Sequence, residues 1–387
     1  MKKSLLALAI GLAAAAGSAY AQNSVTLYGV LDEGVTYVNN VVGSDGQGHT
    51  LWAMQSGVVQ GSRWGLKGSE DLGGGLKTIF QLESGFDLNS GSSLQHSRLF
   101  GRQAYIGLSA ANWGTVTFGR QYDSVVDFVQ PTTMNGYWGA MFSHAGDIDN
   151  SDNGFRVDNA VKYTSPSISG LQFGGMYAFG GVAGSFGQDS TVTAGASYSN
   201  GPVYLGVAYL YAKNPVAQFN DGNWSSFGGD PFFGLLGNTA TSPSNMQVIG
   251  GGGTYQFGPA LLGADYTNSR YDDTIGGATA RFDNYELWGQ YQLTPAATLA
   301  AGYTYTRVHQ DAVYGDAVPK YGQVNFMADY SLSKRTDVYF QGVWQRAYSS
   351  DPLTGQPLPA SIYTGFPGQP SSTNNQVSAR VGIRTKF

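Results

Sequence analysis

The feature that most constrains this sequence is an alternation of apolar and polar residues that recurs along almost its whole length. The C-terminal segment shows it clearly, because Val381 and Ile383 fall on one face and Arg384 falls on the other. A period of two residues is the period of a β-strand whose two faces meet different surroundings. After the N-terminal region no run of 18 apolar residues occurs, so we expect no transmembrane helix.

Sixteen segments show this strand pattern. They span about 24–37, 61–70, 76–87, 98–110, 115–122, 157–165, 170–180, 190–200, 202–212, 246–257, 260–270, 281–293, 297–309, 320–332, 335–348 and 376–387. Their connections alternate between short turns, such as Asn200-Gly201 and Gly258-Pro259, and long polar stretches. The long stretches are 38–60, 88–97, 123–156, 181–189, 213–245, 271–280, 310–319 and 349–375. A barrel that crosses a membrane has short turns on one side and long loops on the other, whereas a soluble sandwich has no reason for this alternation.

Backbone pairing then favours a closed sheet. An unpaired backbone group in lipid costs several kcal/mol, so a spanning chain without helices must close its strands into a barrel. Sixteen strands enclose a water-filled lumen, whereas eight would be filled by side chains. Aromatic residues make up 13 % of the chain, which suits girdles at the two membrane interfaces. We therefore predict an all-β fold, a transmembrane 16-stranded antiparallel β-barrel.

The first 21 residues have the pattern of a cleaved signal peptide. Lys2 and Lys3 precede a mostly apolar stretch, and Ala19-Tyr20-Ala21 supplies a small-residue cleavage site. The alternative, an N-terminal membrane helix, is disfavoured because the apolar run is too short to span about 30 Å of hydrocarbon. We expect export, cleavage after Ala21 and a single barrel domain over residues 22–387.

Composition excludes several other classes. Charged residues are only 12 % and apolar residues 42 %, which argues against a disordered chain. Cysteine is absent, so neither a disulfide framework nor a Cys-ligated metal is possible. The 26 acidic residues outnumber the 21 lysines and arginines, which disfavours a nucleic-acid partner.

Several motifs, spread in order over the mature chain, resemble the general porins of Gram-negative bacteria, with the β-proteobacterial type most similar. The motifs are NSVTLYGVLD (23–32), SRWGLKGSEDLGGG (62–75), FQLESGF (80–86), RQAYIGLS (102–109), GTVTFGR (114–120), NAVKYTSP (159–166) and the terminal Phe387. This resemblance implies a homotrimer in the outer membrane, surrounded by lipid including lipopolysaccharide. It also implies an inward-folded third loop, and a terminal Phe387 read by the outer-membrane insertion machinery.

The segment 123–155 is the candidate third loop and constriction. A connection of this length needs a reason, and packing inside the lumen is one. Eight of its residues would be a costly apolar patch in water but could pack on the inner wall. They are Phe128, Val129, Pro131, Met134, Tyr137, Trp138, Met141 and Phe142. The alternative is a mobile surface loop.

By resemblance, a cluster of arginines on the barrel wall faces this loop. The matching positions are Arg63, Arg102 and Arg156, and further candidates are Arg98, Arg120 and Lys67. The alternation places Arg63 and Lys67 opposite the apolar Trp64 and Leu66, whereas for Arg102 the face rests on the resemblance alone. An arginine can instead be a solvated loop end or part of a structural ion pair. A guanidinium row facing carboxylates creates a transverse field that orients dipolar solutes and rejects apolar ones.

The loop carboxylates lie at its ends. They are Asp123 and Asp127 before the apolar stretch, and Asp147, Asp149 and Asp152 after it. Residues 128–146 contain no acidic residue, so the basic wall is less compensated, and we predict a weak to moderate anion preference. Asp32 and Glu83 would weaken this preference if they face the lumen.

We expect a passive channel for small hydrophilic solutes and ions, with no catalytic, cofactor-binding or metal site. A solute-specific channel for sugars, nucleotides or aromatic acids is the alternative, with Tyr137 and Trp138 as a stacking surface. An outer-membrane barrel enzyme is a remote alternative. Ser143, His144 and Asp147 superficially resemble a hydrolase trio, but neighbouring side chains cannot form the required relay without special geometry.

Overall fold

The computed structural model describes residues 24–219, 231–236, 242–351, 354–363 and 370–387. The predicted signal peptide, residues 1–21, lies outside these ranges, as do parts of the long connections 213–245 and 349–375. Within the described ranges, no helix has the length and apolar character needed to cross a membrane.

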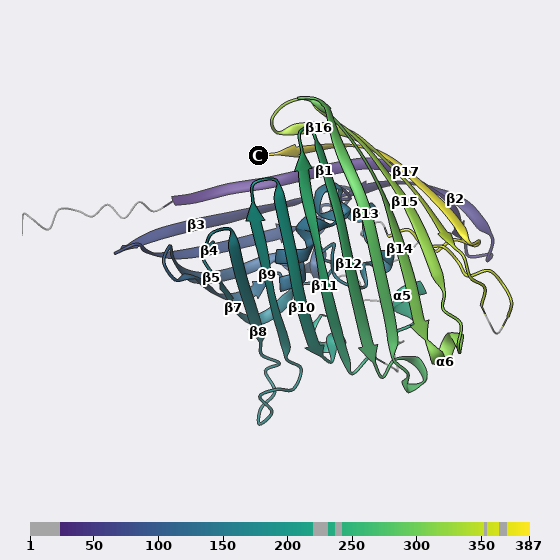
Figure 1. The fold of residues 1–387 in the computed structure, drawn as a ribbon, viewed down its shortest axis with the longest axis horizontal. Helices are drawn as coiled ribbons and strands as arrows, with labels where there is room; N and C mark the ends of the chain where they lie inside the picture. Colours follow the sequence, from purple (N-terminus) through teal and green to yellow (C-terminus); the bar gives the residue numbers. More distant parts are fainter. Residues whose placement is uncertain (1–23, 220–230, 237–241, 352–353, 364–369) are drawn as a thin grey trace, which may run out of the picture.

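The described residues form one antiparallel sheet (Figure 1). Its strands are β1 (Ser24–Val42), β2 (Gly48–Ser56), β3 (Arg63–Gly73), β4 (Leu76–Gly85), β5 (Gln103–Ala110), β6 (Gly114–Gln121), β7 (Val157–Thr164), β8 (Leu171–Ala178), β9 (Thr191–Asn200), β10 (Val203–Lys213), β11 (Asn245–Phe257), β12 (Ala260–Asp272), β13 (Ala280–Thr294), β14 (Ala297–Gln310), β15 (Lys320–Ser331), β16 (Thr336–Ala347) and β17 (Asn375–Lys386). From β3 to β17 each strand pairs with the next, and β17 pairs with β1, which closes the barrel.

Strands β2 and β3 together occupy one position in the barrel. The first half of β1 pairs with β3, where Val30 lies opposite Arg63, and its second half pairs with β2, where Glu33 lies opposite Ser56. Residues 57–62 interrupt this shared position. The Asp32 carboxylate holds the interruption by accepting hydrogen bonds from the backbone N–H groups of Val59 (2.7 Å) and Gln60 (2.8 Å). The barrel therefore has sixteen strand positions, as predicted.

The prediction of a long loop over residues 38–60 is wrong. Strand β1 continues to Val42, a tight turn follows, and β2 returns along β1 from Gly48 to Ser56. The alternation is hidden in this part of the sequence because Leu51-Trp52-Ala53-Met54 is apolar on both faces. The first connection of the predicted long set is therefore a hairpin turn.

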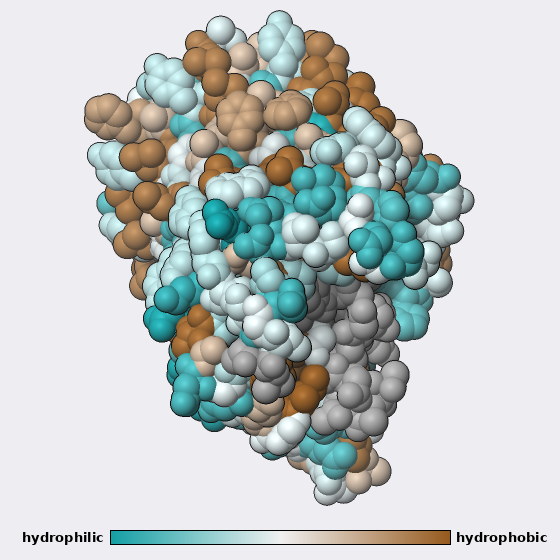
Figure 2. Space-filling view, turned by 90° about the vertical axis from the view of Figure 1, so that its right-hand side faces the viewer, coloured by the Kyte–Doolittle hydropathy of each residue, from teal (hydrophilic) through white to brown (hydrophobic). Residues whose placement is uncertain are grey.

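The two faces of the strands have opposite character. Along β12 the side chains of Leu262 and Tyr266 are exposed, whereas Asp265 and Thr267, which alternate with them, are buried. Polar groups thus point to the interior and apolar groups to the outside, which is the reverse of a soluble protein and what a membrane-spanning barrel requires. On the face shown in Figure 2, hydrophobic residues gather toward the top of the view and hydrophilic residues dominate the middle.

Short and long connections separate to the two ends of the strands. Tight turns join β9 to β10 and β11 to β12, whereas the connections after β6, β8 and β10 are long. The long connection after β14 contains α6 (Asp311–Tyr314), which lies at the same end of the barrel as the β8–β9 connection (Figure 1). Other short helices are α2 (Leu94–Ser97), α4 (Pro215–Gln218), α5 (Pro231–Gly234) and η6 (Ile275–Gly277).

Candidate functional site

The connection between β6 and β7 is a chain of short helical turns. They are η1 (Val125–Val129), η2 (Gln130–Thr132), α3 (Met134–Trp138), η3 (Ala140–Phe142) and η4 (Ala145–Asp147). Phe128, Met134, Met141 and Phe142 are buried, as expected of side chains that pack on a wall. Tyr137 is 37 % exposed but its ring lies 4.8 Å from that of Trp288 on β13.

Glycines on the buried face of the barrel allow this segment to approach closely. A Cβ added to Gly206 on β10 would lie 1.8 Å from the Phe128 carbonyl oxygen, and one on Gly252 would lie 2.4 Å from Thr132 Oγ1. Gly206 alternates along β10 with the exposed Leu205 and Val207, so the segment packs against the face opposite the exposed apolar side chains. Gly250 and Gly252, which face the loop segment, belong to the same crowded wall.

Side chains of the wall hold the backbone of the segment. The Trp288 indole donates to the Thr132 carbonyl (2.8 Å), and the Gln341 amide donates to the Trp138 carbonyl (2.8 Å). In the interruption between β2 and β3, the Val58 carbonyl accepts a hydrogen bond from the backbone N–H of Ala140 (2.8 Å). The segment is thus attached to β13, to β16 and to the interruption beside β1.

A cavity of about 520 Å³ lies between this segment and a wall made by the interruption between β2 and β3, Arg63 at the start of β3, and residues of the β4–β5 connection. Its wall side includes Arg63, Arg102, Arg156 and Tyr122, together with Ser56 and the interruption 57–62. Its other side is formed by Gln130, Asn135, Gly136, Gly139, Ala140 and 152–154 of the β6–β7 segment. The structure therefore brings together the three arginines that the resemblance indicated and the predicted loop.

Ion pairs with Glu83 and contacts with Tyr122 hold the three arginines of the cavity. Arg102 Nε lies 2.9 Å from Glu83 Oε1, and Arg63 Nε lies 3.6 Å from Glu83 Oε2. Arg102 also donates to the Tyr122 hydroxyl (3.1 Å), and the Arg156 guanidinium lies 5.6 Å from the centre of the same ring. Glu83 is 3 % exposed, and its carboxylate partly neutralises the two half-buried arginines.

The remaining basic candidates do not line the cavity. Arg98 and Arg120 both pair with Asp158, at 3.2 Å and 2.6 Å, beside the start of β7. Lys67 is exposed and its ammonium lies 5.2 Å from the centre of the Tyr28 ring.

The loop residues predicted from the sequence to act at the constriction contact different parts of the barrel and loop. Asp123 is buried and accepts hydrogen bonds from Val125 N–H (2.7 Å) and Asn150 (2.6 Å), and its burial raises its pKa to about 6. Asp127 forms an ion pair with Lys162. The Trp138 indole donates to Gln290 (2.9 Å) on β13. Neither Tyr137 nor Trp138 is among the residues that line the cavity.

Asp152 is a cavity residue that was noted in the sequence only as a loop-end carboxylate. It accepts from the Asn135 amide (3.5 Å), and burial raises its pKa to about 7 although Arg156 and Arg102 act to lower it. Tyr363, from the connection before β17, also lines the cavity. No local motif marks either residue, because the fold of distant segments places them here.

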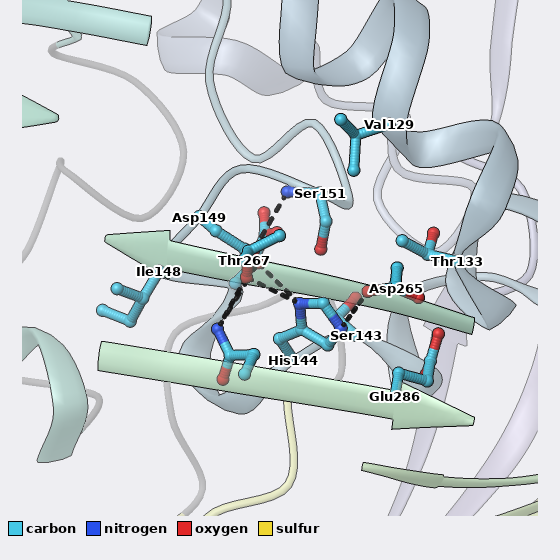
Figure 3. A network of polar contacts seen from close by, with 12 residues as sticks. Val129, Thr133, Ser143, His144, Ile148, Asp149, Ser151, Asp265, Thr267 and Glu286 are labelled. Atoms are coloured by element: carbon cyan, nitrogen blue, oxygen red, sulfur yellow. Dashed lines mark hydrogen bonds and ion pairs between the residues drawn. The ribbon is translucent and has the colours of Figure 1, made fainter. Parts of the chain in front are cut away.

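His144 lies in a second polar cluster between the same segment and strands β12 and β13 (Figure 3). Its Nδ1 lies 2.5 Å from Asp149 Oδ2 and its Nε2 lies 3.2 Å from Asp265 Oδ1. His144, Asp265 and Glu286 together offer three possible metal-ligand atoms within 4.8 Å of one another. Neither the Ser143 hydroxyl nor Asp147 appears among the contacts of the His144 ring, so the hydrolase-like trio is not assembled here.

The terminal residue completes the barrel seam. Phe387 exchanges backbone hydrogen bonds with Gly29 on β1, at 3.0 and 3.1 Å. A Cβ on Gly29 would lie 2.3 Å from Phe387 Cζ, so the ring covers this glycine.

Sequence comparisons identify relatives over most of the chain. A profile of the Gram-negative porin family matches residues 6–347. Outer membrane porin protein 32 of Delftia acidovorans is 30 % identical over 393 residues, which covers both chains completely. An outer membrane porin of Bordetella pertussis is 42 % identical over 242 residues, which are 56 % of this chain and 62 % of that relative. The major outer membrane protein P.IB of Neisseria meningitidis is 27 % identical over 349 residues, 89 % of this chain and 93 % of its own.

Solved structures share the fold at low sequence identity. The anion-selective porin from Comamonas acidovorans superimposes with a TM-score of 0.73 at 22 % identity, covering 95 % of this chain and 100 % of its own. The trimer form of OmpT, an outer membrane protein of Vibrio cholerae, has a TM-score of 0.66 at 16 % identity, covering 94 % of this chain and 99 % of its own.

Proposed function

The chain belongs to the Gram-negative porin family and is an outer membrane porin, and we propose where its pore is narrowest. The proposed constriction is the cavity between Arg63, Arg102 and Arg156 on one side and the segment 123–155 on the other. The observation that carries the proposal is that Arg63, Arg102 and Arg156 line one cavity with residues of that segment. The segment packs on the buried face of the barrel, which supports the inward-folded loop expected from the sequence. Hydrated solutes and ions would pass between a charged wall and polar loop groups.

The charges around the cavity favour a weak to moderate anion preference. Three arginines face Glu83 and Asp152, so the wall keeps a positive excess even when both carboxylates are ionised. A charged ring at the narrowest point of a pore biases ions more than charges elsewhere on the surface. The acidic overall composition, a formal net charge of −5, therefore does not set the selectivity.

The solute-specific alternative has less support. Tyr137 packs on Trp288, and Trp138 donates to Gln290, so neither offers a free stacking face in the cavity. Catalysis has no support either, because the side chains of His144 and Asp149 are fully buried and hydrogen-bonded to each other. We propose that the chain is a channel without enzymatic activity.

We further propose that the protein assembles as a homotrimer, with apolar strand faces such as Leu205 and Val207 available to lipid or to neighbouring barrels. Lipopolysaccharide would surround the outer leaflet end. The insertion machinery would read the C-terminal strand with Phe387, and the signal peptide would be removed after Ala21.

Ion selectivity tests the proposed constriction. In planar bilayers under a salt gradient, wild-type channels should give a reversal potential of the sign that indicates anion preference, and Arg156→Gln should reduce it because one cavity cation is lost. Arg270→Gln is the matched control, since Arg270 is 51 % exposed and pairs with Asp272 at the end of β12. A clear cation preference of the wild type, or equal effects of the two substitutions, would contradict the proposal.

A further inference from the structure

The His144 cluster has the composition and arrangement of a metal site. His144 comes from the loop segment, whereas Asp265 and Glu286 lie directly opposite each other on β12 and β13. One imidazole nitrogen and two carboxylate oxygens thus converge within 4.8 Å of one another. The side chains of His144 and Asp265 are fully buried, and Glu286 is 4 % exposed.

The imidazole is oriented as a ligand. Asp149 accepts from Nδ1, which leaves Nε2 directed toward Asp265. Asp149 is itself held by the Ser151 N–H (3.2 Å) and by the hydroxyl of Thr267. A metal-binding histidine usually donates its other ring N–H to a carboxylate that fixes its orientation.

The Asp265 carboxylate has few partners for a buried charge. Among the described residues, neither of its oxygens accepts a well-directed hydrogen bond, and its ion pair is with the His144 ring at 3.2 Å. Glu286, by contrast, accepts from the Met134 N–H (2.7 Å) and the Thr304 hydroxyl (3.2 Å) and is fixed in place. Two adjacent buried carboxylates with one imidazole leave negative charge that a divalent cation would neutralise.

We propose that His144 Nε2, Asp265 and Glu286 bind a divalent transition-metal ion of the Zn²⁺ class, which ties the loop segment to the barrel wall. Zn²⁺ accepts one imidazole nitrogen and two carboxylate oxygens, with water in the fourth position. Binding displaces any proton from His144 Nε2, and the two carboxylates balance the charge of the ion. The ion is a clamp between His144, just before η4, and strands β12 and β13, and its three ligand residues are not among those that line the cavity.

Zinc content of the full-length protein tests the site. The protein is purified in detergent, stripped with EDTA, and either incubated with ZnCl₂ or refolded in its presence, then desalted and analysed by elemental mass spectrometry. We expect one tightly held zinc per chain and a thermal unfolding midpoint higher with zinc than with EDTA. Asp265→Asn and Glu286→Gln, which keep the side-chain shape, should each lose the zinc and the zinc-dependent rise.

Asp283→Asn is the matched control, because Asp283 lies on β13 near a different histidine, His309, at 3.8 Å. It should retain the zinc. Heat-modifiable migration on gels confirms that each variant is folded. Absence of zinc from wild-type protein in both loading procedures would overturn the proposal, as would equal zinc retention by wild type, Asp265→Asn and Glu286→Gln.

Discussion

For single residues, cavity-lining side chains that lie in or beside a local sequence motif could be predicted, whereas those that only the folding of distant segments brings to the cavity could not. Arg63 and Arg102 lie in recognisable motifs, Arg156 lies three residues before another, and the three meet in one cavity. Glu83 was noted only as a residue that could face the lumen, and the structure pairs it with two of these arginines. Asp152 reaches the same cavity because the loop returns there, which no spacing in the sequence indicates.

Asp152 gives the cavity a pH dependence. Burial raises the pKa of its carboxyl to about 7, so the carboxyl is largely neutral below that pH and negatively charged above it. The charged side chains that act on it are Arg102, Arg156 and Asp149. We therefore expect the anion preference to be stronger at pH 6 than at pH 8 in reversal-potential measurements. Asp152→Asn should weaken this difference, whereas Ser93→Ala, at an uncharged residue of the cavity lining, should keep it. A pH dependence that is unchanged in Asp152→Asn would assign it to another group.

At the scale of elements, periodicity predicted the sixteen strand positions because each strand separates lipid from a polar interior. Strand β2 escaped detection since residues 51–54 are apolar on both faces, and only its pairing with β1 reveals it. The β6–β7 segment was expected to pack inward from its apolar composition. Its helical turns are too short to carry a periodic signal, so their order could not be predicted.

The close contact between Gly206 on β10 and the loop segment can be tested by substitution. Gly206→Ala adds a methyl group that would lie only 1.8 Å from the Phe128 carbonyl oxygen, so the loop segment must move away from β10. Overpacking of this kind costs about 1–3 kcal/mol, and we expect a lower thermal unfolding midpoint by circular dichroism and an altered single-channel conductance.

Gly251→Ala is the control for that substitution. Gly251 lies on β11 opposite the exposed Val207 of β10, on the face that points away from the loop segment. The nearest atom to a Cβ added there is the Val207 Cγ1 methyl at 3.1 Å. This variant should behave nearly as the wild type. Indistinguishable unfolding midpoints and conductances for the two alanine variants would show that the loop does not pack against Gly206.

At the scale of the whole molecule, the barrel depends on closure between its first and last strands. Nine residue pairs join β1 to β17, and Phe387 extends the seam to Gly29. Deletion of Phe387 should reduce the yield of assembled protein in outer-membrane fractions more than the conductance of the channels that form. A normal yield with a changed conductance would place the role of Phe387 in the pore instead.

If the proposed constriction is right, solutes cross the barrel through the cavity between the arginines and the loop segment. Because the chain contains no cysteine, one introduced thiol can be modified selectively. Ser97→Cys places it at the cavity lining, and Ser333→Cys places it in the exposed turn between β15 and β16. In single-channel recordings, attachment of a bulky thiol reagent to Ser97→Cys should reduce the conductance, whereas the same reaction at Ser333→Cys should leave it unchanged. A fully modified Ser97→Cys channel that conducts like the unmodified one would contradict the account.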